Sequence, residues 1–202
     1  LNYNTAIRLD PANYNTYNRR GILYGFYLEK KEKGIADCSK AIALNPEFGK
    51  PYTNRATLYG DIGKNEEAFA DFNIGMKLMP DWSISHLNRG SLYNDLERYE
   101  EAIADFTRCL ELSPLARDEL KAYNWRADAY MQLGQYENAL KDINKLIELE
   151  PESALYRYRR AKLYEGFSST STNANEYYQI KIHIEDNYNK AIELNPQYYN
   201  AY

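Results

Sequence analysis

The sequence has few of the features that mark nucleic-acid-binding, membrane or secreted proteins. Its 202 residues contain no apolar stretch that approaches the roughly 18 residues of a membrane-spanning helix. The 25 basic residues are outnumbered by 29 acidic ones, for a net charge of −4, so we expect neither nucleic acid nor membrane insertion among its interactions. The chain starts at Leu1 without the basic and apolar segments of a signal peptide, which leaves open one further upstream.

Groups for catalysis or cofactor binding are equally scarce. The two cysteines, Cys38 and Cys109, fall on apolar stripes of predicted helices and are interpreted as small core residues, a usage that favours a reducing, cytoplasmic compartment. His86 stands where sister units have tyrosine, and His183 has no cysteine or acid at a metal-ligand spacing. The sequence also has no glycine-rich phosphate loop and no nucleophile-elbow motif. It therefore predicts a protein that is not an enzyme and has no metal or cofactor.

A unit of about 34 residues repeats along almost the whole chain. Each unit ends in a proline with a leucine two residues before it, and contains a tyrosine with a small residue three positions earlier. Proline lacks an N–H and cannot continue a helix, so it separates one hairpin from the next. The prolines are Pro11, Pro46, Pro80, Pro114, Pro151 and Pro196; the leucines Leu9, Leu44, Leu78, Leu112, Leu149 and Leu194; the tyrosines Tyr24, Tyr59, Tyr93, Tyr130 and Tyr164; and the small residues Gly21, Ala56, Gly90, Ala127 and Ala161.

This pattern resembles the helix–turn–helix unit of the tetratricopeptide repeat family. The resemblance implies an all-α fold, a right-handed α-solenoid of stacked antiparallel hairpins, because a single hairpin cannot bury its apolar stripe alone. We predict one array over 1–202. It comprises the second helix of a truncated repeat at 1–13, five repeats at 14–47, 48–81, 82–115, 116–152 and 153–197, and the start of a further repeat at 198–202.

Two insertions interrupt the period. Three extra residues within 115–119 are expected to lengthen either the loop between two repeats or the start of the next helix. A polar insertion at 167–175 lies inside the last hairpin and is predicted to form a mobile loop, with the second helix resuming near Glu176. Its composition is more typical of a tolerated linker than of a functional loop.

Arginines and aspartates recur with the same period. An arginine stands four residues before each repeated tyrosine, and an aspartate nine residues before four of the prolines, with Asn187 in the last repeat. A guanidinium partly buried between helices needs a partner, so we predict a structural ladder of ion pairs rather than a strip that binds phosphate or acidic peptides. Its members are Arg20, Arg55, Arg89, Arg126, Arg160, Asp37, Asp71, Asp105 and Asp142.

In this family partners usually lie in a concave groove lined by the first helices of the hairpins. Asparagines there can donate to and accept from a peptide backbone. Leu87, Trp125 and Tyr158 could form an exposed apolar cluster of the kind that anchors protein partners, with packing of Trp125 into the next repeat as the alternative. The predicted groove residues are Asn54, Leu87, Asn88, Ser91, Lys121, Asn124, Trp125, Asp128, Tyr158, Arg159 and Lys162.

Some family members grip the acidic C-terminal tail of heat-shock chaperones through a carboxylate clamp. The clamp resembles a lysine and an asparagine one turn apart on one first helix, an asparagine on the next, and a lysine and an arginine on the third. No starting repeat of this chain supplies more than two of those five residues. The resemblance therefore predicts that clamp-type chaperone tails are not the partner.

The function that these features predict is a non-catalytic scaffold that binds a peptide or extended segment of another protein in its groove. Two alternatives stay open. The repeats could be the targeting or regulatory region of a larger multidomain enzyme, or a module that self-associates into homo-oligomers through its end helices.

Overall fold

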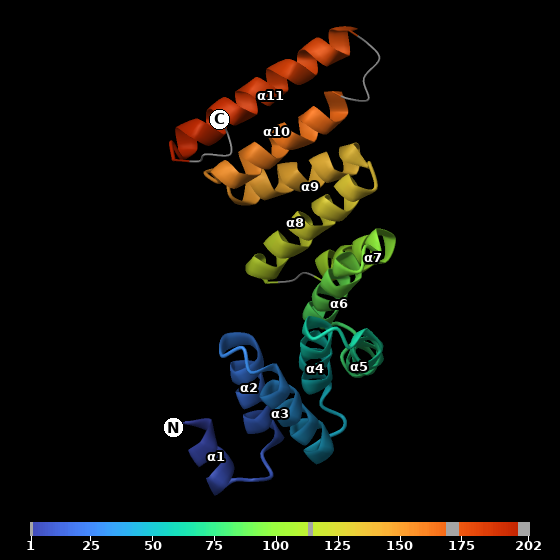
Figure 1. Ribbon diagram of the computed structural model, residues 1–202, viewed down its shortest axis with the longest axis vertical. Coiled ribbons are helices and arrows are strands. Elements are labelled where there is room, and N and C mark those ends of the chain that lie inside the picture. The colour runs from blue at the N-terminus through green and yellow to red at the C-terminus, as the bar shows by residue number, and fades with distance from the viewer. Residues whose placement is uncertain (1, 113–114, 169–173, 198–202) are drawn as a thin grey trace. The chain divides into compact units, whose positions relative to one another are not determined.

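The computed structural model describes residues 2–112, 115–168 and 174–197, and these residues form helices and no strand (Figure 1). The prediction of an all-α fold built from helical hairpins is confirmed. The chain divides into two compact units, residues 1–95 and 96–202. The boundary falls within the third predicted repeat, so its two helices belong to different units.

The described residues of the first unit form six α-helices and one π-helical segment. Two complete hairpins lie within it, α2 with α3 and α4 with α5, and α6 packs against both α4 and α5. The helices are α1 (Tyr3–Leu9), α2 (Tyr14–Ile22), η1 (Leu23–Tyr27), α3 (Lys31–Leu44), α4 (Gly49–Asp61), α5 (Asn65–Leu78) and α6 (Ser83–Asp95).

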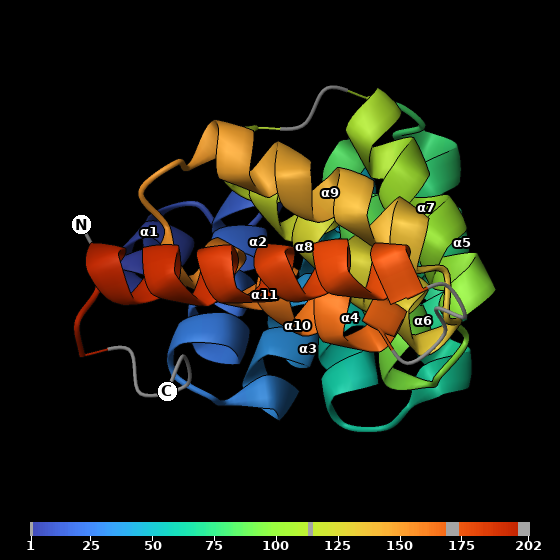
Figure 2. The ribbon, with the colours of Figure 1, turned by 90° about the horizontal axis from the view of Figure 1, so that it is seen from above.

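In the second unit, residues 96–112, 115–168 and 174–197 form five helices. Its hairpins pair α8 with α9 and α10 with α11, and α7 packs against α8. Both views of the ribbon show α11 lying alongside α10 (Figures 1 and 2). The helices are α7 (Tyr99–Glu111), α8 (Ala116–Gln132), α9 (Tyr136–Leu149), α10 (Ala154–Ser168) and α11 (Ala174–Leu194).

The insertions are absorbed in different ways. Between Tyr24 and Pro46 the first full repeat has one residue more than the second, third and fourth repeats have. Here α2 runs into the π-helical segment η1, which takes up an extra residue without ending the helix. The insertion at 115–119 lengthens the start of the next helix, because α8 has 17 residues whereas α4 has 13. The predicted loop at 167–175 falls largely outside the described residues, as do 198–202.

Small residues let the paired helices approach closely. A Cβ on Gly21 would lie 2.9 Å from the Cys38 sulfur, so only glycine fits at that contact between α2 and α3. Phe72 and Phe106, with no exposed surface, fill the space beside equally buried alanines of the second helices. Burial of these side chains supplies most of the driving force for each unit.

Asparagine is common partly because it terminates helices. The side-chain oxygens of Asn2 and Asn13 accept from the backbone N–H groups of Thr5 and Thr16, so both residues cap a helix start. Asn45 follows the last residue of α3, and its side chain accepts from the N–H of Glu47. These local bonds favour turns over continued helix.

Candidate interaction surface

The repeated arginines are fixed between helices. Arg20, Arg55 and Arg126 each use Nε and Nη2 to hold both oxygens of one aspartate on the following helix, at 2.7–2.9 Å. The three aspartates, Asp37, Asp71 and Asp142, are 3–7% exposed. Such two-point pairs orient the guanidinium rigidly.

A third contact joins each arginine to the second helix of the preceding hairpin. The Nη1 groups of Arg20, Arg55 and Arg126 donate to the side chains of Asn4, Ser39 and Thr107 at 2.7–2.8 Å. Arg89 and Arg160 reach Asn73 and Asn144 in the same way. Each of these arginines thus ties its own helix to the one before it, which is a structural use of the charge.

Tyrosines complete this arrangement. The guanidinium of Arg55 lies 5.9 Å from the Tyr52 ring and 5.7 Å from the Tyr59 ring, and Arg126 lies equally close to Tyr123 and Tyr130. Cation–π attraction of this kind is strongest where the charge is shielded from water. Part of the unusual tyrosine content therefore belongs to the ladder rather than to a binding surface.

In the first unit two predicted groove residues, Asn54 and Asn88, are hydrogen-bonded to side chains of neighbouring first helices. Asn54, only 8% exposed, donates from Nδ2 to Oδ1 of Asn18 at 2.9 Å. Asn88 on α6 donates to the Thr57 hydroxyl on α4 at 3.0 Å. These bonds tie neighbouring first helices together and use part of the capacity that a peptide would need.

The expected exposed cluster of Leu87, Trp125 and Tyr158 is wrong for Leu87, which is 2% exposed. Trp125 is half-buried, with its ring centroid 6.0 Å from that of Phe106, and Tyr158 is half-buried with its ring 5.8 Å from Tyr188. Trp125 thus packs in part against α7 of the preceding repeat, whereas the alternative had placed it against the next one.

In the second unit the candidate residues of α8 and α10 form a mixed polar and aromatic surface. On α8, the Lys121 ammonium lies 5.9 Å from the Trp125 ring centroid. Asp128 of α8 forms an ion pair with Arg159 of α10. Lys162 is exposed on α10 and pairs with a glutamate one turn further on. The Asp128–Arg159 ion pair joins the two first helices, α8 and α10.

Two polar atoms on this surface have unused hydrogen-bonding capacity. Among the described residues, the side-chain oxygen of Asn124 and Nε of Arg159 are buried without a partner. The remaining predicted groove residue, Ser91, lies on α6 in the first unit and is half-buried. A buried polar atom left without a partner costs roughly 1–3 kcal/mol, so each such atom in a native protein calls for an explanation.

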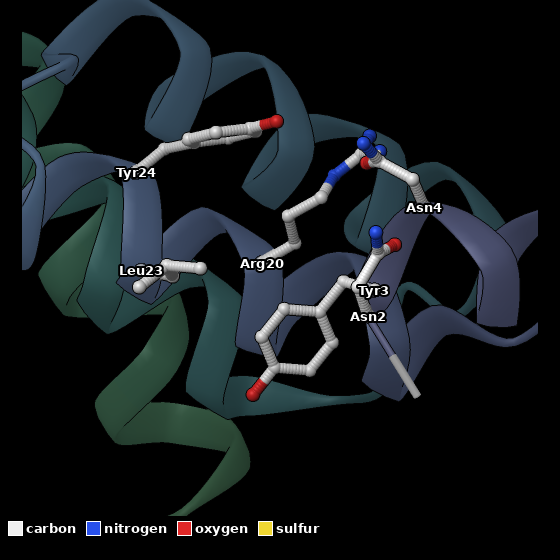
Figure 3. Close-up of a pocket in the computed structure, with 6 residues that line it drawn as sticks. All are labelled: Asn2, Tyr3, Asn4, Arg20, Leu23 and Tyr24. Carbon is white, nitrogen blue, oxygen red and sulfur yellow. The ribbon is translucent and has the colours of Figure 1, made fainter.

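A separate hollow of about 360 Å³ lies between α1 and α2 in the first unit. In Figure 3 the guanidinium of Arg20 lies next to the Asn4 side chain, and Tyr3 and Tyr24 also border the hollow. Arg20 is already engaged by Asp37, and this contact helps to raise the pKa of the guanidinium above its usual value. The charged residue that is known to line the hollow is therefore already paired.

The described part of the chain contains no group of three or more acidic, histidine or cysteine side chains that could hold a metal ion. Within the same residues, no helix has the length and apolar character required to cross a membrane.

Residues 83–114 and 120–153 match family models described as tetratricopeptide repeat. No curated protein matches the chain. Similar solved structures include YrrB, described as a TPR protein with an unusual peptide-binding site (18% identity, 100% of this chain and 96% of that one, TM-score 0.71). MamA from Desulfovibrio magneticus RS-1 is similar at 18% identity over 94% of this chain and 97% of that one, with a TM-score of 0.71. The first TPR of Spaghetti (RPAP3), bound to the HSP90 peptide SRMEEVD, has 26% identity over 59% of this chain and 94% of its own, with a TM-score of 0.54.

Proposed function

Because this chain belongs to the tetratricopeptide repeat family, we propose that it is a non-catalytic interaction scaffold that binds an extended segment of a partner protein along α8 and α10. Two similar structures, YrrB and the Spaghetti domain, are described with a peptide-binding site or a bound peptide, which supports this use of the fold. The proposed surface consists of Lys121, Asn124, Trp125, Asp128, Tyr158, Arg159 and Lys162.

The observation that carries the proposal is the pair of unsatisfied atoms on this surface. Both atoms are buried, so both side chains must adjust before the Asn124 oxygen can accept from a peptide N–H and Arg159 Nε can donate to a peptide carbonyl. An extended peptide presents both groups along its backbone, so it can satisfy both atoms at once. Neither atom contributes a hydrogen bond within the described residues.

Side chains around these atoms indicate which peptides fit. Trp125 keeps part of its ring exposed and supplies an apolar contact, while the exposed Lys121 contacts no carboxylate among the described residues. The charges of Asp128 and Arg159 neutralise each other. The surface therefore favours an extended segment with an apolar residue flanked by an acidic one.

The test is to select peptides that bind the full chain from a displayed library and to measure their affinity for the Asn124→Ala variant. Because the lost oxygen has no partner among the described residues, we expect an unchanged or raised melting temperature together with an affinity about tenfold weaker or more. Asn189→Ala, at an exposed position on α11, serves as the matched control and should bind like the wild type. Equal affinity of the Asn124→Ala variant for every selected peptide would remove α8 from the binding surface.

The same assay separates this surface from a carboxylate clamp. The clamp pattern is incomplete in every register of this chain, so the peptide SRMEEVD, bound by the Spaghetti domain, should show no measurable affinity. Binding of SRMEEVD at micromolar concentration would contradict the prediction against clamp-type partners.

A further inference from the structure

The last repeat departs from the arginine ladder at two positions, and both changes add positive charge to the same site. In the first, second and fourth repeats the ladder arginine has an aspartate on the next helix and a tyrosine three residues before it. In the last repeat these positions hold Asn187 and Arg157. A neutral residue thus replaces the acid, and a cation replaces the tyrosine, around Arg160.

Arg160 has neutral partners only. Its Nε donates to the Asn187 side-chain oxygen at 2.7 Å, and its Nη1 donates to Asn144 at 2.8 Å. No carboxylate among the described residues contacts this guanidinium. Burial, and then repulsion from Arg157, lower the pKa of Arg160, whereas hydrogen bonds to Asp37 and Asp71 help to raise the pKa of Arg20 and Arg55. The positive charge of Arg160 is therefore uncompensated.

Arg157 is even less satisfied. It lies three residues before Arg160 on α10, so the two side chains share a face of the helix. The Arg157 side chain makes no hydrogen bond, ion pair or ring contact with any described residue, and its Nε is buried without a partner. Two adjacent half-buried guanidinium groups repel each other. An oxyanion between them would attract both groups and offset that repulsion.

We propose that Arg157 and Arg160 form an oxyanion-binding site specific for a phosphate group, as the free ion or on a phosphorylated side chain of a partner. Asn187 contributes because it is neutral: the aspartate found at this position in other repeats would compete with the anion for the guanidinium. The site is separate from the proposed peptide surface of α8 and α10, whose arginine is Arg159, and it does not depend on that function.

Phosphate fits this site better than a carboxylate does. At pH 7 a phosphate monoester carries a charge of about −1.5 to −2 and three acceptor oxygens, whereas a carboxylate carries one charge and two oxygens. The terminal nitrogens of Arg157 and Nη2 of Arg160 have no partner among the described residues, so they can donate together to a tetrahedral group. Arg157 also lies in the first turn of α10, where the helix dipole favours an anion.

In the test, the full chain is titrated with inorganic phosphate, which replaces chloride so that the ionic strength stays constant. The arginine Nε–H resonances and the melting temperature are followed. A phosphoserine peptide and its unphosphorylated form provide the second arm. The variants are Arg157→Tyr and Asn187→Asp, each of which installs the residue found in the first, second and fourth repeats and so suits the fold. Arg117→Gln, whose side chain is 83% exposed on α8, is the control.

We expect phosphate to raise the melting temperature of the wild type and of the Arg117→Gln variant, and to shift the Arg157 and Arg160 resonances. Affinity should fall about tenfold or more in both repeat-restoring variants, because one removes a donor and the other supplies a competing carboxylate. Tighter binding of the phosphoserine peptide than of the free ion identifies a phosphorylated partner, and the reverse order identifies the ion. A wild type that does not distinguish phosphate from chloride, or an Arg157→Tyr variant that binds phosphate as the wild type does, would overturn the proposal.

Discussion

Replacing Arg126 with alanine tests the ladder where it is most completely described. The change removes two hydrogen bonds to Asp142, at 2.8 and 2.7 Å, and one to Thr107 at 2.8 Å. It also leaves the Asp142 carboxylate, 3% exposed, without its counter-charge. Breaking a buried pair from one side costs about 3–5 kcal/mol, a large part of the roughly 5–15 kcal/mol by which a domain is stable.

The measurement is urea unfolding followed by far-UV circular dichroism for Arg126→Ala, Asp142→Ala and the double variant. The double variant should be less destabilised than the sum of the single ones, because it leaves no isolated charge. Arg108→Ala is the control: the Arg108–Glu111 pair is about half exposed, and its loss should cost at most about 0.5 kcal/mol. If Arg126→Ala costs no more than Arg108→Ala, the ladder is not a structural element.

Two other features of the chain give predictions of their own. Gly134 has φ +68 with no atom within 4 Å of an added Cβ, so Gly134→Ala should lower the free energy of unfolding by about 1 kcal/mol through backbone strain alone. Glu97 has φ +58 at the equivalent turn, so Glu97→Gly should raise the free energy of unfolding by roughly 0.5 kcal/mol. Thermal unfolding of both variants checks these values, and a stabilised Gly134→Ala or a destabilised Glu97→Gly variant would refute the role of backbone strain. Burial raises the pKa of the Cys38 and Cys109 thiols to about 12, so a thiol reagent at pH 8 should modify neither in the native protein and both after unfolding. Rapid modification of the native protein would contradict this protection. Because both thiols ionise at lower pH when the protein is unfolded, the same burial predicts that the free energy of unfolding falls above about pH 8.5.

The repeat pattern was sufficient to predict the fold class because one physical requirement recurs at each landmark. Each repeated proline stands just beyond a second helix, which it cannot continue, and a small residue such as Gly21 allows the two helices of a hairpin to approach closely. The equal spacing of arginine and aspartate indicated which charges would meet, since a matched period places both on facing helices. Such rules are local or periodic, so they can be read from one sequence.

Exposure along the first helices could not be predicted in the same way. Leu87 and Trp125 occupy neighbouring offsets in their repeats, yet the first is buried and the second keeps part of its ring exposed. Burial depends on how far each helix turns toward the next one, and insertions alter this from repeat to repeat. The unsatisfied oxygen of Asn124 was also invisible in the sequence, because hydrogen-bond partners are set by side-chain geometry rather than by residue type.

The most direct test of the proposed function places a bound peptide on the protein. The chain has two tryptophans, Trp82 on the loop before α6 in the first unit and Trp125 on the proposed surface, so their indole N–H resonances report on two sites at once. On titration with a selected peptide, we expect the Trp125 indole and Asn124 carboxamide resonances to shift while the Trp82 indole resonance stays in place. Saturating peptide that leaves Trp125 and Asn124 unshifted would contradict binding along α8 and α10.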